Sequence, residues 1–117
     1  MSMMIKVALA VVGLAISASP ALAAPTYLSC DLGQEGKTFI VKVTADEAEG
    51  AVGIYIPSTD YREKVRGAFT ADKVLFETDV IAYDLNRVNL KIKQVTKGFG
   101  WVTNGTCIIE QPPKRAF

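Results

Sequence analysis

The sequence predicts a small all-β domain, an antiparallel meander barrel of about eight short strands closed by one disulfide. Apolar and polar residues alternate along most of the chain, as they do in strands that bury one face. Turn-forming residues recur at a spacing of about 8–12 residues, which is typical of barrels and sandwiches. The only two cysteines, Cys30 and Cys107, stand near the first and last of these strands.

Residues 1–23 have the three parts of a secretory signal peptide. Lys6 charges the start, the run from Val7 to Ile16 is wholly apolar, and Ala21-Leu22-Ala23 forms a small-residue cleavage site. The apolar run is short for a membrane span, so a cleaved leader is favoured over an N-terminal anchor. We expect a periplasmic or secreted product.

The charge of the mature part is balanced. Loss of Lys6 leaves 12 of the 13 basic residues against 12 acidic ones, which gives no overall attraction to nucleic acid or an anionic membrane. We expect no stable membrane insertion after cleavage. The length suits one domain, with residues 24–110 as the β domain and residues 111–117 as a C-terminal tail.

Strands are expected wherever the alternation is unbroken, at residues 27–32, 38–43, 51–56, 62–69, 74–76, 81–85 and 88–93. Residues 101–110 are expected to form a last hairpin or bulged strand, with Asn104-Gly105 as its turn. The triplet Asn104-Gly105-Thr106 also matches a glycosylation acceptor. Residues 44–49 are rich in helix formers, but the segment is too short for more than one helical turn.

The cysteines are expected to pair. Cys30 shares a strand face with Leu28 and Leu32, and Cys107 shares one with Ile109, so both side chains should point inward. An oxidising compartment favours a disulfide over two free thiols. A disulfide between the first and last strands would join the two edges of the sheet and keep them from pairing with other chains. This favours a barrel over an open sandwich.

The polar residues give little sign of catalysis. The chain has no histidine, which excludes Ser-His-Asp and Cys-His nucleophiles and the usual zinc sites. Asp46, Glu47 and Glu49 cluster in one connection, where a solvated loop is favoured over a catalytic or calcium site because the calcium-loop spacing is absent. We expect no enzyme activity, no cofactor and no metal.

Basic residues alternate on two predicted strands. Arg62, Lys64 and Arg66 share one face of the first, and Lys91 and Lys93 share one face of the second. If these strands are neighbours, the residues form a patch that attracts an anionic polymer or an acidic protein surface. Otherwise they are charges on an ordinary solvated face, which keep sheet edges apart.

The segment Lys97, Gly98, Phe99 and Trp101 is the candidate partner-binding loop. A tryptophan beside glycine and lysine in a loop can anchor a partner protein. Alternatively, Trp101 caps the open end of the barrel.

Two resemblances follow from short motifs. Tyr27-Leu28-Ser29-Cys30-Asp31-Leu32-Gly33, Thr96-Lys97-Gly98 and Cys107 are similar in order to the membrane-bound and periplasmic C-type lysozyme inhibitors, small bacterial envelope β-barrels. That resemblance implies a loop that inserts into a lysozyme cleft, with Lys97 as a matching residue. The family's Ser-Gly-x-x-Tyr motif is absent, and Tyr83-Asp84-Leu85-Asn86-Arg87 stands in that region.

Other segments resemble small exported proteobacterial proteins of no assigned function: Leu85-Asn86-Arg87-Val88, Gly105-Thr106-Cys107 and Arg115-Ala116-Phe117. We therefore expect a non-enzymatic exported binding or envelope-associated protein, whose partner is another envelope or secreted protein. One alternative is a periplasmic inhibitor of a lysozyme-type cell-wall hydrolase. Another is a small-ligand carrier, although the bulky inward residues predict a filled barrel. The sequence predicts no oligomeric state.

Overall fold

A computed structural model describes residues 24–112 of the chain. The predicted signal peptide, residues 1–23, and the last part of the predicted tail, residues 113–117, lie outside the described residues. Residues 24–112 contain no helix with the length and hydropathy of a membrane span.

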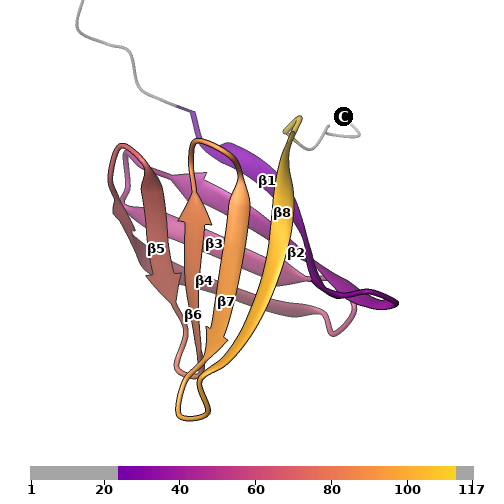
Figure 1. The fold of residues 1–117 in the computed structure, drawn as a ribbon. Helices are drawn as coiled ribbons and strands as arrows, with labels where there is room; N and C mark the ends of the chain where they lie inside the picture. The colour runs from indigo at the N-terminus through magenta and orange to yellow at the C-terminus, as the bar shows by residue number, and fades with distance from the viewer. Residues whose placement is uncertain (1–23, 113–117) are drawn as a thin grey trace, which may run out of the picture.

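The fold is a closed eight-stranded barrel in which every strand pairs antiparallel with its sequence neighbours and β8 returns to pair with β1 (Figure 1). The predicted all-β meander barrel is confirmed. The strands are β1 (Thr26–Gln34), β2 (Lys37–Asp46), β3 (Ala51–Ile56), β4 (Tyr61–Phe69), β5 (Lys73–Glu77), β6 (Ile81–Asn86), β7 (Lys91–Thr96) and β8 (Trp101–Glu110).

Alternate residues of the strands fill the interior. Phe76 and Tyr83 are direct cross-strand partners on β5 and β6, and their rings stack with centroids 4.8 Å apart. The buried hydrophobic residues form one cluster: Leu28, Cys30, Leu32, Val41, Val43, Ala45, Val52, Ile54, Val74, Phe76, Tyr83, Leu85, Ile92 and Cys107. This single core follows from the period of two that predicted the strands.

The predicted disulfide is confirmed. Cys30 and Cys107 are direct partners in the β1–β8 register and are bonded, with their Cα atoms 3.9 Å apart. The Cys107 amide donates to the Leu90 carbonyl oxygen at 2.7 Å, so it points away from β1. The cysteines therefore occupy a non-hydrogen-bonded pair, where side chains of opposite strands come closest. The bond lies across the seam at which the barrel closes.

The predicted turn at Asn104-Gly105 is wrong. Both residues lie inside β8, where Asn104 pairs with Lys93 and Gly105 pairs with both Ile92 and Leu32. A Cβ atom on Gly105 would sit 2.3 Å from the Asp31 carbonyl oxygen. The glycine is needed because β1 and β8 approach closely there, which local turn propensity cannot reveal.

The predicted start of the seventh strand is also wrong. Val88 is 76% exposed and lies in the β6–β7 turn, because the Asn86 side-chain oxygen accepts hydrogen bonds from the Val88 and Asn89 amides at 2.8 and 3.0 Å. Such a side-chain-capped turn reverses the chain locally. Residues 44–49 form no helix, since β2 continues to Asp46.

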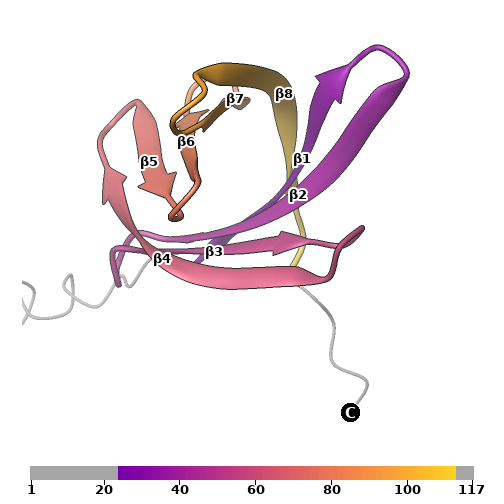
Figure 2. The same cartoon turned by 90° about the horizontal axis from the view of Figure 1, so that it is seen from below.

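The β1–β2 hairpin extends beyond the barrel wall. Pairing of β1 with β8 ends at Leu32 and Gly105, and pairing of β2 with β3 ends at Lys42 and Tyr55. Further out, the two strands pair only with each other. Figure 2 shows this hairpin leaning away from the other strands.

Candidate functional site

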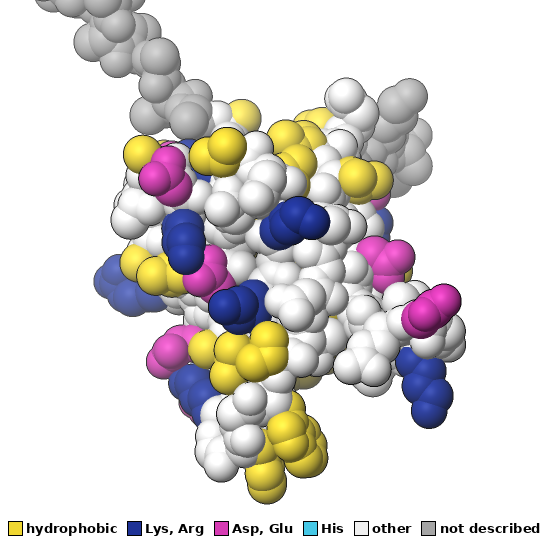
Figure 3. All heavy atoms as spheres, viewed as in Figure 1, with side chains coloured by type: hydrophobic (Ala, Val, Ile, Leu, Met, Phe, Trp, Pro, Cys, Tyr) yellow, Lys and Arg dark blue, Asp and Glu magenta, His cyan; other side chains and the backbone are white. Residues whose placement is uncertain are grey.

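The β7–β8 turn carries the most exposed aromatic pair among the described residues. Phe99 and Trp101 stack on each other with ring centroids 4.8 Å apart and an interplanar angle of 20°. Their residues are 69% and 66% exposed. Figure 3 shows hydrophobic side chains gathered at this end of the molecule. We call Lys97, Gly98, Phe99, Gly100 and Trp101 the aromatic tip.

Two glycines shape the aromatic tip. Gly98 and Gly100 have φ angles of 86° and 71°, in the left-handed region that glycine adopts without steric penalty. The turn therefore projects Phe99 between them. The structure brings together all four predicted residues of this loop, Lys97, Gly98, Phe99 and Trp101. Trp101 does not cap the barrel, however, because two thirds of it is exposed.

Lys97 braces the aromatic tip against the β5–β6 connection. Its ammonium group lies 3.0 Å from a Glu77 carboxylate oxygen and donates to the Thr78 carbonyl oxygen at 2.8 Å. Its backbone amide donates to the Val80 carbonyl oxygen, also at 2.8 Å. The side chain that the lysozyme-inhibitor resemblance singled out is thus engaged within the chain, and the two aromatic rings are the projecting groups.

The end of the barrel that bears the aromatic tip carries more carboxylates than cations. The turns of an up-and-down barrel alternate between its ends, so the β1–β2, β3–β4, β5–β6 and β7–β8 turns share one end. The charged residues in or next to these four turns are Glu35, Asp60, Glu77, Asp79, Lys37 and Lys97. The surplus of negative charge would attract a basic surface.

Two tyrosine hydroxyls near this end stay protonated at neutral pH. The Tyr61 hydroxyl donates to the Glu63 carboxylate. This hydrogen bond, with burial and the neighbouring negative charge, raises the pKa of Tyr61 to about 12. Burial raises the pKa of Tyr83, opposed by the hydrogen bond that its oxygen accepts from Gln94. Neither tyrosine is poised as a general base.

The basic residues do not form one patch. Arg62, Lys64 and Arg66 lie on β4, and Lys91 and Lys93 on β7, with β5 and β6 between them. Arg66 and Lys93 border one shallow depression on the outer face, but Glu77 and Asp84 also line it. The condition for a joint basic patch, that the two strands be neighbours, is not met.

The connection that contains Asp46, Glu47 and Glu49, which we call the acidic turn, forms two ion pairs with other parts of the chain. Glu47 lies 2.8 Å from Arg87 and Glu49 lies 3.2 Å from Lys64. The Asp46 carboxylate accepts from the Glu49 amide at 3.1 Å. Among residues 24–112, no three His, Cys, Asp or Glu side chains are grouped closely enough to hold a metal ion. The arrangement is that of a solvated loop.

The interior has a small hollow at the opposite end. It has a volume of about 240 Å³ and lies between inward residues that include Leu28, Phe69 and Leu85, with Glu47 and Arg87 at its rim. Small-molecule sites usually measure roughly 300–1,000 Å³. A carrier built on this hollow would therefore hold only a small molecule or the end of a longer one.

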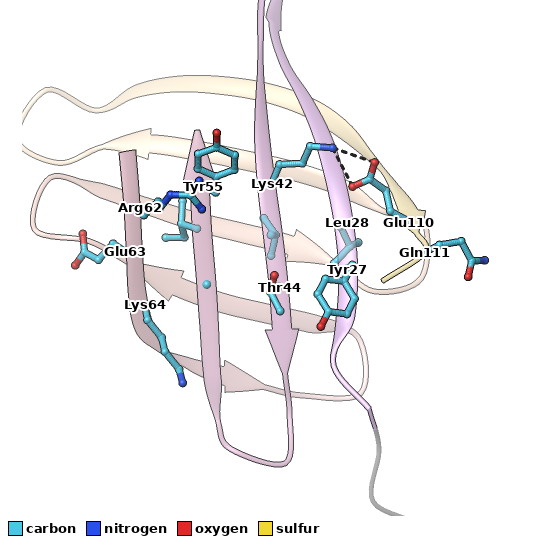
Figure 4. Close-up of a pocket in the computed structure, with 13 residues that line it drawn as sticks. Tyr27, Leu28, Lys42, Thr44, Tyr55, Arg62, Glu63, Lys64, Glu110 and Gln111 are labelled. Atoms are coloured by element: carbon cyan, nitrogen blue, oxygen red, sulfur yellow. Dashed lines mark hydrogen bonds and ion pairs between the residues drawn. The ribbon is translucent and has the colours of Figure 1, made fainter. Parts of the chain in front are cut away.

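An open groove on the outer face of β1–β4 was missed by sequence reasoning. It has a volume of about 630 Å³ and is lined by side chains that include Tyr27, Lys42 and Tyr55 (Figure 4). Gly53 also lines it, on β3 beside Thr44. The available signal was Gly53 itself, because a glycine inside a strand often marks a close approach by another molecule.

No protein-family model, curated protein or solved structure matches the chain.

Proposed function

We propose that this protein is a non-enzymatic, exported binding protein that contacts a partner protein through its aromatic tip. The observation that carries the proposal is the stacked pair of Phe99 and Trp101, which is largely exposed and stands on a turn whose first residue, Lys97, is anchored to the β5–β6 connection. Exposed aromatic rings on a fixed support are typical binding hot spots, because little side-chain freedom is lost when a partner covers them.

The exposed rings provide a substantial driving force for association. Phe and Trp side chains each bury about 150–250 Å² when fully enclosed. Covering the exposed parts of both rings therefore contributes on the order of 5 kcal/mol, before the cost of the motional freedom lost on association is subtracted. A small tip of this kind suits a partner with an apolar pocket or cleft.

The export part of the proposal is supported by the Cys30–Cys107 disulfide, since such bonds persist mainly in oxidising compartments. The non-enzymatic part is supported by the lack of histidine and by the carboxylates of Glu47 and Glu49, which are held in surface ion pairs. A catalytic acid or base needs an environment that shifts its pKa toward neutrality.

The partner that fits best is a basic cell-wall hydrolase of the C-type lysozyme class. The carboxylate-rich end around the aromatic tip would attract a basic protein. The motif resemblance to the inhibitors of such enzymes leads to the same candidate. In this proposal Phe99 and Trp101 enter the partner's cleft, and Lys97 holds the turn that presents them.

The test is titration of the mature protein against a C-type lysozyme, with affinity measured by calorimetry and inhibition measured as the rate of cell-wall lysis. We expect Phe99→Ser combined with Trp101→Ser to weaken binding at least about 30-fold, the equivalent of about 2 kcal/mol. Val88→Ser is the matched control, because Val88 is equally exposed but lies in a turn at the opposite end of β7.

Binding that survives the double substitution would contradict the proposal, as would a lysozyme that neither binds nor is inhibited. A loss of binding in Val88→Ser of similar size would show that exposed apolar area in general, rather than the aromatic tip, drives the association.

A further inference from the structure

The outer groove of β1–β4 is built around a glycine that the backbone does not require. Gly53 has no positive φ angle, and a Cβ atom added to it would lie 3.6 Å from the nearest atom, the Thr44 Cβ. Gly67 and Gly105 differ, because a Cβ on either would come within 2.6 Å of a neighbour. A side chain fits at Gly53, and its absence leaves the floor of the groove open.

Side chains of five strands surround this floor. Tyr27, Thr44, Gly53 and Lys64 are successive cross-strand partners on β1–β4 and form one outward row. Lys42, Tyr55 and Arg62 form the next row. Glu110 of β8 closes one end, and Figure 4 shows its carboxylate beside the Lys42 ammonium group.

The polar groups at the rim are fixed by contacts with each other. The Lys42 ammonium group donates to both Glu110 carboxylate oxygens at 3.0 Å. The Arg62 guanidinium carbon lies 3.8 Å from the centre of the Tyr55 ring, a cation–π contact that orients the ring. The groove thus presents two phenol rings together with donors and acceptors held at its edges.

The surroundings restrict the chemistry of an occupant. A peptide strand needs a free sheet edge, but on the floor of the groove β1, β2, β3 and β4 pair with one another, so no edge is free there. A polyanion would meet the Glu110 carboxylate and would have to displace the acidic partners of Lys42 and Lys64. A wholly apolar ligand would stay exposed to water, because the groove is open to solvent.

We propose that this groove binds a neutral pyranose unit of a glycan. A sugar ring has a C–H face that packs on tyrosine rings and a rim of hydroxyls, each both a donor and an acceptor. The rim of the groove offers both kinds of partner. The cations at the groove each have an acidic partner within the chain, Glu110 for Lys42, Asp60 for Arg62 and Glu49 for Lys64, which suits an uncharged ligand. This site is separate from the aromatic tip and does not depend on the proposed function.

The experiment is an NMR titration of the ¹⁵N-labelled mature protein with two neutral probes, cellotetraose and the β-1,4-linked tetramer of N-acetylglucosamine. We expect at least one probe to shift the amide signals of Thr44, Gly53 and Tyr55. In Gly53→Val, which fills the floor without disturbing the backbone, the affinity should fall at least about tenfold. A thermal melt verifies that the variant is folded.

Phe99→Ser is the control at the aromatic tip and should bind the sugar as the wild type does. A matched acidic oligosaccharide and an extended peptide complete the set. The proposal is overturned if neither neutral probe shifts the groove signals or if folded Gly53→Val binds unchanged. It is likewise overturned if only the acidic sugar or the peptide responds.

Discussion

Two glycines inside strands, Gly105 and Gly53, have different structural roles. Gly105 lies where β8 and β1 approach, and the Asp31 carbonyl oxygen and the Leu32 Cα occupy the space that a Cβ would need. Gly53 lies on the outer face with ordinary space above it. The first glycine is required for the barrel to close, and the second only shapes its surface.

Gly105→Ala should therefore destabilise the protein strongly, by about 2 kcal/mol or more, because rigid backbone atoms must move to admit the methyl group. Gly53→Ala should leave the free energy of unfolding unchanged or raise it by up to about 1 kcal/mol, since alanine restricts the unfolded chain. Urea denaturation of the oxidised proteins measures both. Equal effects of the two substitutions would contradict this distinction.

At the scale of elements, the β7–β8 hairpin and the β5–β6 connection act together. Three contacts from Lys97 join them, one each to Glu77, Thr78 and Val80. The Glu77 contact reaches from the end of β7 to β5, which is not its neighbour in the barrel, whereas the Val80 contact continues the β6–β7 ladder. They anchor the first residue of a turn that contains two left-handed glycines and carries the stacked rings, and we expect them to restrict the motion of that turn.

Lys97→Met should change the unfolding free energy by less than about 1 kcal/mol, because the ion pair is partly exposed to solvent. The aromatic tip should nevertheless become more mobile on the nanosecond timescale. Heteronuclear NOE values of Gly98, Phe99 and Gly100 measure this. Lys93→Met, which removes the same charge from the outer face of β7, is the control, and unchanged NOE values in Lys97→Met would refute the bracing role.

At the scale of the whole molecule, closure of the barrel depends on the β1–β8 seam. The first and last strands meet there, and the disulfide crosses them over a sequence separation of 77 residues. A domain of this size buries only about 60–65% of the surface that its unfolded chain exposes. Covalent closure therefore contributes a large part of the net stability.

Replacing both cysteines, Cys30→Ala with Cys107→Ala, should lower the free energy of unfolding by about 4 kcal/mol, because the unfolded chain regains the freedom of a long loop. Chemical denaturation of the variant and of the reduced wild type should give similar losses. A loss below about 1 kcal/mol would mean that the seam is held by its backbone hydrogen bonds and core packing alone.

The fold was predictable from the sequence because strand periodicity is local. Along Phe39, Val41 and Val43, for example, the alternation within one strand is enough to determine which side chains point inward. The inward cysteines were predictable for the same reason. The aromatic tip was predictable in composition, since a tryptophan beside glycine and lysine stands out, but the exposure of Trp101 was not.

The two errors in the strand assignment have different causes, the first a contact between distant segments and the second a local side-chain cap. Asn104-Gly105 has the composition of a turn and lies in a strand because β1 passes within contact distance of it. Val88 continues an alternating pattern and lies in a turn because the Asn86 side chain caps the chain first. The groove between Tyr27 and Tyr55 joins residues from separate strands, which no single stretch of sequence indicates.

By itself the sequence determined the all-β class, the inward faces of the strands and the partners of the disulfide, because each depends on alternation within a strand or on there being only two cysteines. The tertiary structure alone decided which outward residues meet. Strand order separates Lys91 and Lys93 from Arg62, Lys64 and Arg66, places Lys97 against Glu77, and brings Glu110 to Lys42. Surface neighbours on a barrel are set by register and closure, and these depend on the sum of all pairings rather than on any one segment.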